Sequence, residues 1–445
     1  MISVLGCDEG ARSRVEPGDP GDGRLAADVG RSDAVPDGDP VDAAPPDLAL
    51  PDAAADAAPP DAAADAAPPD AAPPDAAAPD LGPSPVCRVD VERIPRDEHF
   101  EFEPILDRAE LYATARSPDG LARTVRLRDG APVGGPADRL ITARDGAFLL
   151  ARPDGDRGAR LIYRDAGGDR ALAEAFTPVI GWSRVDWRPP RLVEPDHAIY
   201  LLDARLFEWR RGADPVPIGD GVGQAALDGG DVAWLIGDSP AEPPAEPPGG
   251  AWLVVHRAGQ PDRSIGPFAR PLPESLRLSR GHVWWLAEGG QPVSHAIASG
   301  AQRFHAIDGC HDLDADGPVA VAACGEPGAQ RLVRLDADGE PRRLADAAQL
   351  VAPRFADGWI AYAAYDDPDA WCAAGPLTIG RVYWHPLDAP AEPIAEIASG
   401  CLCCGAFWPQ LVFELGDDTL AWSYGIPGAR DAAIGVARRT CDRDD

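Results

Sequence analysis

A pair of short apolar runs recurs from residue 87 to the end of the chain. Each repeat has a turn with Asp or Gly, an apolar run of three or four residues, and a second run soon after. The first runs begin at residues 111, 148, 199, 232, 283, 319, 360 and 420. The second runs begin at residues 124, 161, 206, 253, 295, 332, 382 and 434. Aromatic and β-branched residues between Gly, Pro and Asp turns are typical of strands, so residues 87–445 are predicted to be all-β.

The spacing of these repeats indicates a particular arrangement of the strands. Successive first runs lie on average about 44 residues apart, and a four-stranded propeller blade takes roughly 40–45 residues. Eight repeats therefore predict a β-propeller with eight blades, and a seven-bladed ring is the nearest alternative. An array of β-sandwiches is the alternative fold, because it also consists of short strands and frequent turns.

The first residues of this region fit a role in closing the ring. Residues 99–106 fit the innermost strand of the first blade, which leaves residues 88–94 without a place in it. We expect residues 88–94 to pair with residues 434–439 as the outer strand of the last blade, which leaves no open edge at the joint. Cys87 and Cys441 flank the two segments, so this pairing predicts a disulfide between them.

The other cysteines of this region fall on one predicted face. Cys310 lies in a connection between blades and Cys324 at the end of a second strand, so a disulfide between them is expected. Two long loops of the same face carry the remaining four, Cys372, Cys401, Cys403 and Cys404. An even number of cysteines besides Cys7 suits disulfides in an oxidising compartment. A four-thiolate metal site and free thiols are the alternatives for these four, although C-x-C-C is not the usual C-x-x-C zinc spacing.

Residues 8–86 have the composition of a linker. Between residues 42 and 80 there are nine Asp and no basic residue, in a near-repeat of Pro-Pro-Asp-Ala-Ala. Such a segment buries too little apolar surface to offset the entropy of ordering it, and frequent Pro prevents a helix. We expect a disordered, acidic tether ahead of the domain at residues 87–445.

The first seven residues resemble the end of a lipoprotein signal peptide. Val4, Leu5 and Gly6 precede Cys7, and this sequence resembles the lipobox of bacterial lipoproteins, where an acylated cysteine follows small residues. The resemblance implies lipid on Cys7, a signal peptide that begins upstream of Met1, and a protein held at the cell envelope, in the periplasm or on the outer surface. The alternative is a cytoplasmic protein with this sequence by chance.

Composition excludes several partners and activities. The formal net charge is −32 and every basic residue is Arg, which argues against nucleic acid and against a basic membrane patch. We therefore expect membrane contact only through the lipid, and a monomer. The chain has no Lys, no Asn and no G-x-S-x-G, H-E-x-x-H or P-loop motif, so no catalytic signature is present and we do not expect an enzyme.

One acidic run matches part of a calcium-binding loop. Asp312, Asp314 and Asp316 alternate along the chain and precede a Gly, as in the first half of an EF-hand loop. The twelfth position is Ala323 instead of Glu, which excludes a complete EF-hand. Calcium in a shorter loop is thus the one cofactor that the sequence suggests, and a hairpin turn is the alternative.

A four-residue turn suggests a family. Ser117-Pro118-Asp119-Gly120 resembles the turn of TolB-like and WD40-like bacterial propellers, and the repeats over residues 88–441 are similar in texture. The resemblance implies a periplasmic or surface binding scaffold and supplies no catalytic residues.

These features together predict a binding or scaffold lipoprotein that presents a propeller to a protein or glycan. Long connections at residues 239–250, 366–380 and 424–431 fall on one face by strand parity, beside residues 398–410. This face would carry Trp371, Phe407 and Trp408, of the type that anchors interfaces, whereas most of the 12 Trp are expected in the core.

The alternative function is a propeller enzyme, a hydrolase or lyase with acidic residues or calcium in the central channel. Acids or His converging in the channel would favour the enzyme. An apolar channel together with an aromatic face would favour the binding protein.

Overall fold

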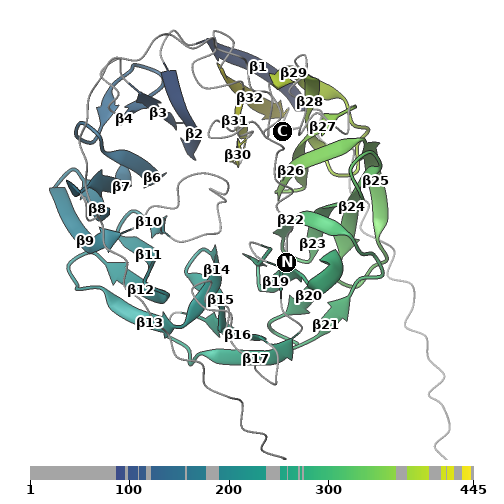
Figure 1. The fold of residues 1–445 in the computed structure, drawn as a ribbon, viewed down its shortest axis with the longest axis horizontal. Helices are drawn as coiled ribbons and strands as arrows, with labels where there is room; N and C mark the ends of the chain where they lie inside the picture. The colour runs from purple at the N-terminus through teal and green to yellow at the C-terminus, as the bar shows by residue number, and fades with distance from the viewer. Residues whose placement is uncertain are drawn as a thin grey trace, which may run out of the picture. The chain divides into compact units, whose positions relative to one another are not determined.

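The strands of the computed structural model form eight antiparallel sheets of four strands in the part of the chain that it describes. That part comprises residues 87–95, 99–108, 110–116, 122–155, 158–176, 190–236, 251–257, 259–268, 271–272, 275–366, 378–399, 412–416, 418–424 and 433–441. The sheets follow one another around a ring, and the first strand of each lies nearest the centre (Figure 1). The predicted eight-bladed propeller is confirmed, and the seven-bladed ring and the sandwich array are wrong.

Within each blade the four strands run in order from the centre of the ring outwards. Blades one to four are β2 (His99–Asp107), β3 (Glu110–Arg116), β4 (Ala122–Arg126), β5 (Pro132–Val133); β6 (Arg139–Arg144), β7 (Ala147–Pro153), β8 (Ala159–Asp165), β9 (Gly168–Phe176); β10 (Arg191–Glu194), β11 (His197–Leu202), β12 (Arg205–Arg210), β13 (Val216–Asp220); and β14 (Val222–Asp228), β15 (Asp231–Ile236), β16 (Ala251–His256), β17 (Arg263–Phe268). Blades five to eight are β18 (Arg277–Ser279), β19 (His282–Leu286), β20 (Pro292–Ala296), β21 (Gln302–Phe304); β22 (Cys310–Asp316), β23 (Val319–Cys324), β24 (Gln330–Asp336), β25 (Arg342–Ala347); β26 (Gln349–Ala356), β27 (Trp359–Tyr365), β28 (Thr378–Pro386), β29 (Pro393–Ser399); and β30 (Val412–Leu415), β31 (Thr419–Tyr424), β32 (Ala433–Cys441), β1 (Cys87–Pro95). A 3-10 turn, η2 (Glu288–Gly290), follows β19. Among the described residues, no helix has the length and apolar character needed to cross a membrane.

The apolar repeats correspond to the two middle strands of the blades. All eight first runs begin in second strands, and all eight second runs begin in third strands. Some predicted boundaries were wrong. The run expected from His295 belongs to β20, which begins at Pro292, and Gly380 and Tyr424, expected in loops, lie within β28 and β31. Pro and Gly are depleted in strands. The sequence pattern therefore indicated turns near these positions, and the predicted strands were too short.

Tight turns join the first and second strands of several blades. Asp145 and Gly146 have φ values of 49° and 78°, and Arg280 and Gly281 have values of 44° and 76°. Positive φ at both central residues defines the type I′ turn, which matches the twist of an antiparallel hairpin. These turns lie at one end of the ring axis, which we call the turn face. The connections from second to third strands lie at the opposite end, the loop face.

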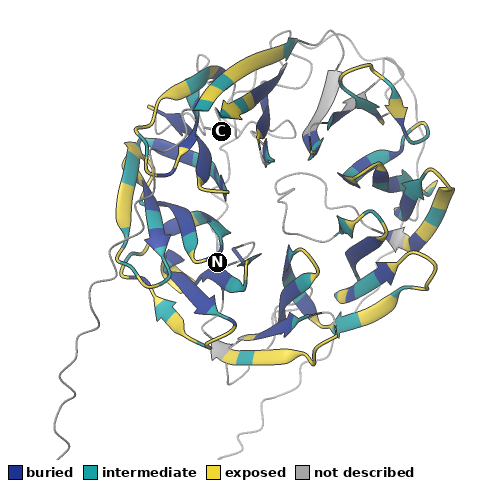
Figure 2. Ribbon diagram, turned by 180° about the vertical axis from the view of Figure 1, so that it is seen from behind, coloured by how far each residue is buried: buried dark blue, intermediate teal, exposed yellow. Residues whose placement is uncertain are grey.

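The core is divided among the contacts between blades. The described residues form eight buried apolar clusters, and each combines side chains from two consecutive blades. At the last contact, Leu111 and Ala113 of blade one pack against Ala421, Ile434 and Val436 of blade eight. Burying one such branched side chain contributes about 1.5–3 kcal/mol. Each blade is therefore packed against a neighbouring blade on both sides. Figure 2 shows that buried residues lie mainly in the middle strands of the blades and exposed residues mainly along the outer strands.

Tryptophans supply much of this core, as predicted. Of the tryptophans that the structure describes, seven are buried: Trp209, Trp234, Trp284, Trp285, Trp359, Trp384 and Trp422. Trp252 on β16 is an exception and is 44% exposed. Gly435 lies directly opposite Trp422 in the neighbouring strand, and a Cβ at this glycine would overlap the indole ring. Because Gly435 of β32 has no side chain, the indole ring of Trp422 on β31 has room to pack against it.

The ring is closed by the pairing that the sequence predicts. β1 and β32 are antiparallel and in register from Cys87 opposite Cys441 to Pro95 opposite Ala433. A disulfide joins Cys87 to Cys441, which confirms the predicted bond. The last blade therefore takes its outer strand from the start of the domain and its other three strands from the end.

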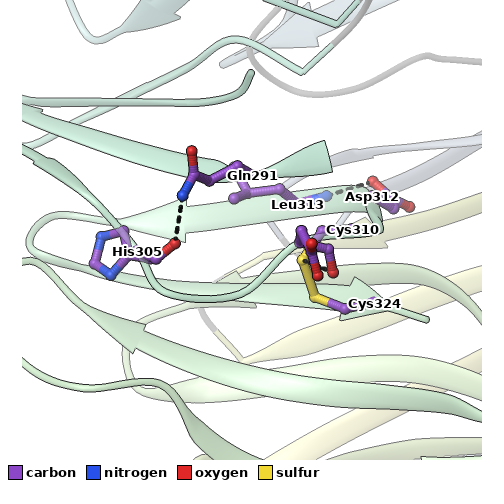
Figure 3. The surroundings of a disulfide bond; sticks show 7 residues. Gln291, His305, Cys310, Asp312, Leu313 and Cys324 are labelled. Atoms are coloured by element: carbon purple, nitrogen blue, oxygen red, sulfur yellow. Dashed lines mark hydrogen bonds between the residues drawn. A yellow bond between two sulfur atoms is a disulfide. The ribbon is translucent and has the colours of Figure 1, made fainter. Parts of the chain in front are cut away.

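A second predicted disulfide, between Cys310 and Cys324, is also confirmed. The two residues face each other across β22 and β23, at the loop-face end of blade six. Figure 3 shows the adjoining contacts, in which the Leu313 amide donates to Asp312 Oδ1 at 2.9 Å.

Several sequence predictions concern residues outside the described part of the chain. These are residues 1–86, including Cys7, the cysteines Cys372, Cys401, Cys403 and Cys404, and the aromatic residues Trp371, Phe407 and Trp408.

We predict that the ring-closing disulfide stabilises the protein more than the internal one. The bonded residues are 354 positions apart for Cys87–Cys441 and 14 for Cys310–Cys324. Since a cross-link restricts the unfolded chain more when it closes a longer loop, the expected losses are about 5 kcal/mol or more for the first and about 3 kcal/mol for the second. Urea unfolding of the two double Cys→Ser variants, followed by Trp fluorescence, measures both. Equal losses would contradict the prediction.

Candidate functional site

A cavity of about 240 Å³ lies where the inner strands meet at the centre of the ring. Its lining comes from β6, β10, β14, β18, β22, β26 and β30 and from the turn after β14. Most of these residues lie close to the ends at which inner strands turn into second strands. The cavity therefore lies toward the turn face, and we call it the channel-mouth cavity.

The lining of this cavity combines charged and apolar side chains. Three arginines line it, Arg144, Arg191 and Arg354, together with Asp228 and Asp314. The channel is thus not apolar at this level. The acids of the cavity are also accompanied by arginines. The cavity therefore matches neither the apolar channel expected of a binding protein nor the converging acids expected of an enzyme.

Asp314 is the most buried acid of the cavity, at 7% exposed. Its Oδ2 accepts a hydrogen bond of 2.8 Å from the Phe355 amide on the next blade, and its Oδ1 lies 3.7 Å from Arg277 Nε on the preceding blade. Burial raises the pKa of Asp314 to about 6, although Arg354 and Arg277 act in the opposite direction. Asp314 thus connects blades five, six and seven.

Asp316, two residues further along β22, makes a second set of contacts between blades. Its Oδ1 lies 3.0 Å from Arg280 Nε, and its Oδ2 accepts a 2.8 Å hydrogen bond from the Asp357 amide. Arg280 also pairs with the Asp357 carboxylate at 2.7 Å, and its backbone amide donates to Asp228. One arginine in a turn therefore contacts acids or amides of three other blades.

The acidic run predicted as a calcium loop is a strand in the structure. Asp312, Asp314 and Asp316 all belong to β22, and Gly317, with φ of 61°, begins the turn. Alternate residues share one face of a strand, so the spacing that matches a calcium loop also fits this strand. Each of the three carboxylates lies beside an arginine, since Asp312 and Asp314 are 3.8 Å and 3.7 Å from Arg277 and Asp316 is 3.0 Å from Arg280. Among the described residues, no three His, Cys, Asp or Glu side chains group as metal ligands.

A strained bulge precedes Arg354 on β26. The pairing of β26 with β27 shifts register between Val351 and Arg354, and Ala352 has a φ of 51°. Ala352 is the only non-glycine residue with positive φ inside a described strand. Such a conformation costs on the order of 1–3 kcal/mol, and bulges re-aim side chains near functional sites. Sequence reasoning missed this feature, although Pro353 within a strand was a signal for a bulge.

Comparison with known proteins gives no family for this sequence. No protein-family model matches the sequence, and no curated protein does. BamB from Moraxella catarrhalis is 14% identical, with 79% of this chain and 100% of that chain covered and a TM-score of 0.46. The propeller domain of the Trilobed protease from Pyrococcus furiosus is 9% identical, with 78% and 99% covered and a TM-score of 0.42. At such identities the likeness concerns the propeller fold alone.

We predict that ionised Asp314 lowers the stability of the protein at neutral pH. Its pKa is about 6 in the folded protein and 3.8 in its ordinary state, so the folded state binds this proton more tightly. As the pH rises from about 4 to 7, wild type should lose on the order of 1–3 kcal/mol relative to Asp314→Asn. Urea unfolding of both proteins at pH 4 and pH 7.5 gives this difference.

The matched control for this experiment is Asp312→Asn on the same strand. This variant removes a carboxylate whose side chain is 30% exposed, and its stability profile should run parallel to that of wild type across the same pH range. Parallel pH profiles for wild type and Asp314→Asn would contradict the role assigned to burial of Asp314.

Proposed function

We propose that this propeller is a non-enzymatic binding scaffold that presents its faces to a protein or glycan partner. The observation that supports this most is the way the channel acids are held. Asp314 accepts a backbone amide hydrogen bond beside Arg277, and Asp316 is paired with Arg280 and with a backbone amide. Charge-assisted hydrogen bonds of this kind fix side chains in place. A rigid ring with loops at its ends suits recognition, since binding residues are often carried by loops on a firm support.

The second candidate function is a propeller enzyme, a hydrolase or lyase with an acid in the channel. One observation favours it, because a buried carboxyl with a raised pKa in a cavity is a candidate general acid or base. Asp314 fits this description. However, one of its oxygens already accepts the Phe355 amide, and Asp228 in the same cavity accepts the Arg280 amide. Both acids thus have fixed structural partners, which favours the binding scaffold.

The proposal includes attachment to the cell envelope. Lipid on Cys7 and the acidic segment of residues 8–86 would hold the propeller at a distance from the membrane. The two disulfides support this location, because such bonds persist in oxidising compartments outside the cytoplasm.

Mass spectrometry of the protein purified from its native membranes tests the attachment. We expect a fatty-acylated Cys7 as the first residue of the mature chain, and an unacylated soluble product for Cys7→Ser. A native protein that keeps an unmodified Met1 and fractionates with the cytosol would contradict the lipid anchor without affecting the binding function.

The binding function is tested on the loop face. We expect Trp371→Ala with Trp408→Ala to weaken partner capture by at least tenfold, because central aromatic residues contribute on the order of 2 kcal/mol or more to an interface. Trp252→Ala is the matched control, since Trp252 is an exposed aromatic residue on a strand. The measurement compares partner recovery from native envelope extracts by wild type and both variants. Equal recovery by all three would exclude this face as the binding site.

A further inference from the structure

The two disulfides of the propeller differ in their exposure to solvent. Cys310 and Cys324 are 2% and 0% exposed and belong to the apolar cluster between blades five and six. Cys87 and Cys441 are only half-buried, and they end the ladder between β1 and β32 at the turn face. Thiol–disulfide exchange requires access to a sulfur atom. A thiol in solution should therefore reach the ring-closing bond more easily than the internal one.

β1 is attached to its neighbouring strand in a different way from the other outer strands. In the seven other blades the third strand continues through a turn into the fourth. β1 and β32 instead come from opposite ends of the domain, and Cys87 and Cys441 are 354 positions apart. Figure 1 shows β1 on the rim of the ring, outside β32. The disulfide therefore takes the place of a turn, and unlike a turn it can be opened by thiol exchange.

Side-chain packing holds β1 only weakly. None of its described side chains is buried. Val89 and Ile94 pack partly against apolar clusters, whereas Val91 is 45% exposed. Glu92 lies 3.3 Å from Arg438, but both side chains are more than half exposed, and exposed ion pairs contribute little to stability. Apart from the disulfide, β1 is thus held mainly by its backbone ladder with β32.

The contacts between blades do not depend on β1. At the contact of blades eight and one, all the buried side chains come from β3, β31 and β32. The cluster between blades seven and eight likewise takes its buried side chains from other strands. The blades should therefore stay packed against one another when β1 leaves β32.

We propose that Cys87–Cys441 is a thiol-exchange site, at which an external dithiol detaches β1 from the folded ring. One thiolate of the dithiol attacks a sulfur of the disulfide, whose S–S bond breaks, so that one cysteine leaves as a thiolate and the other forms a mixed disulfide. The second thiol of the dithiol then displaces this other cysteine and closes the reagent's own disulfide. Two electrons thus pass from the dithiol to the protein, and both cysteines end as thiols.

The reaction changes the edge of the last blade. Without the disulfide, β1 can leave, and β32 then becomes an open edge strand, of the kind that pairs with an extended segment of another chain. Cys310–Cys324 remains closed because it is buried. The site requires no ligand on the loop face, so the inference goes beyond the proposed binding function.

Reduction of the folded full chain by dithiothreitol tests the site. Differential alkylation followed by peptide mapping gives the rate for each disulfide separately. We expect Cys87–Cys441 to open faster than Cys310–Cys324 by on the order of tenfold or more, because access limits exchange. In urea that unfolds the chain the two rates should converge, which is the internal control. Equal rates in the folded protein, or faster opening of Cys310–Cys324, would overturn the proposal.

Hydrogen exchange of the selectively reduced protein tests the release of β1. Amide protection should fall in β1 and in the amides of β32 that face it, and stay unchanged in β22 and β23 of blade six. The matched control is Cys310→Ser with Cys324→Ser, in which reduction should expose β1 as in wild type. Protection of β1 that survives reduction would overturn its release. So would a loss of Trp fluorescence from the core at the same rate as reduction, because the ring would then be unfolding as a whole.

A second reductant identifies the source of the dithiol. Dithiothreitol is small, whereas a thioredoxin-type protein presents its C-x-x-C pair on a folded surface. Opening by both supports a protein dithiol as the source, and opening by dithiothreitol alone supports a small one. Resistance to both would overturn the proposal. Partner capture by the oxidised protein is measured independently, so failure of the binding function remains distinguishable from failure of this site.

Discussion

The pairing of β1 with β32 is the interaction on which the rest of the structure depends. Each apolar cluster joins only two consecutive blades, so a ring without this pairing would begin and end at a weak joint. The in-register ladder and the Cys87–Cys441 bond connect the two ends of the domain. The apolar cluster between blades eight and one then completes the set of eight. Only in a closed ring do Arg144 and Arg354, from distant parts of the chain, line one cavity.

The ionic contacts of the turn face fix the positions of the inner-strand ends, but they contribute little to the free energy of unfolding. Arg280 is 61% exposed on its side chain, and exposed ion pairs contribute only about 0–1 kcal/mol each. Its contacts nevertheless include Asp228, Asp316 and Asp357, which belong to three other blades. Together with the buried Asp314, they hold the ends of neighbouring inner strands in fixed positions. The cavity between those ends is thus surrounded by constrained backbone.

The sequence allowed the strands to be predicted better than the site. Second and third strands carry dense apolar runs, because both their faces are packed, and the two disulfides follow from where those strands end. Inner strands carry more polar residues, as in β22, and six of the eight pair with the second strand through a register shift. Each shift changes which side chains face the channel, so Arg354 could not be assigned to the cavity from its position alone. The Asp312–Asp316 run was ambiguous for a related reason, since alternation fits both a calcium loop and a strand.

The two ends of the blades can serve different ligands without interfering. β22 runs from Cys310 at the loop face to Asp316 at the turn face, so a partner bound at one end would not contact the residues at the other end of the strand. Coupling between two sites requires an element with two arrangements of similar free energy. Each blade is packed on both sides and the ring is covalently closed, which leaves little room for a second arrangement. Binding of a partner at the loop face should therefore leave the turn face unchanged, and the propeller would act as a rigid body.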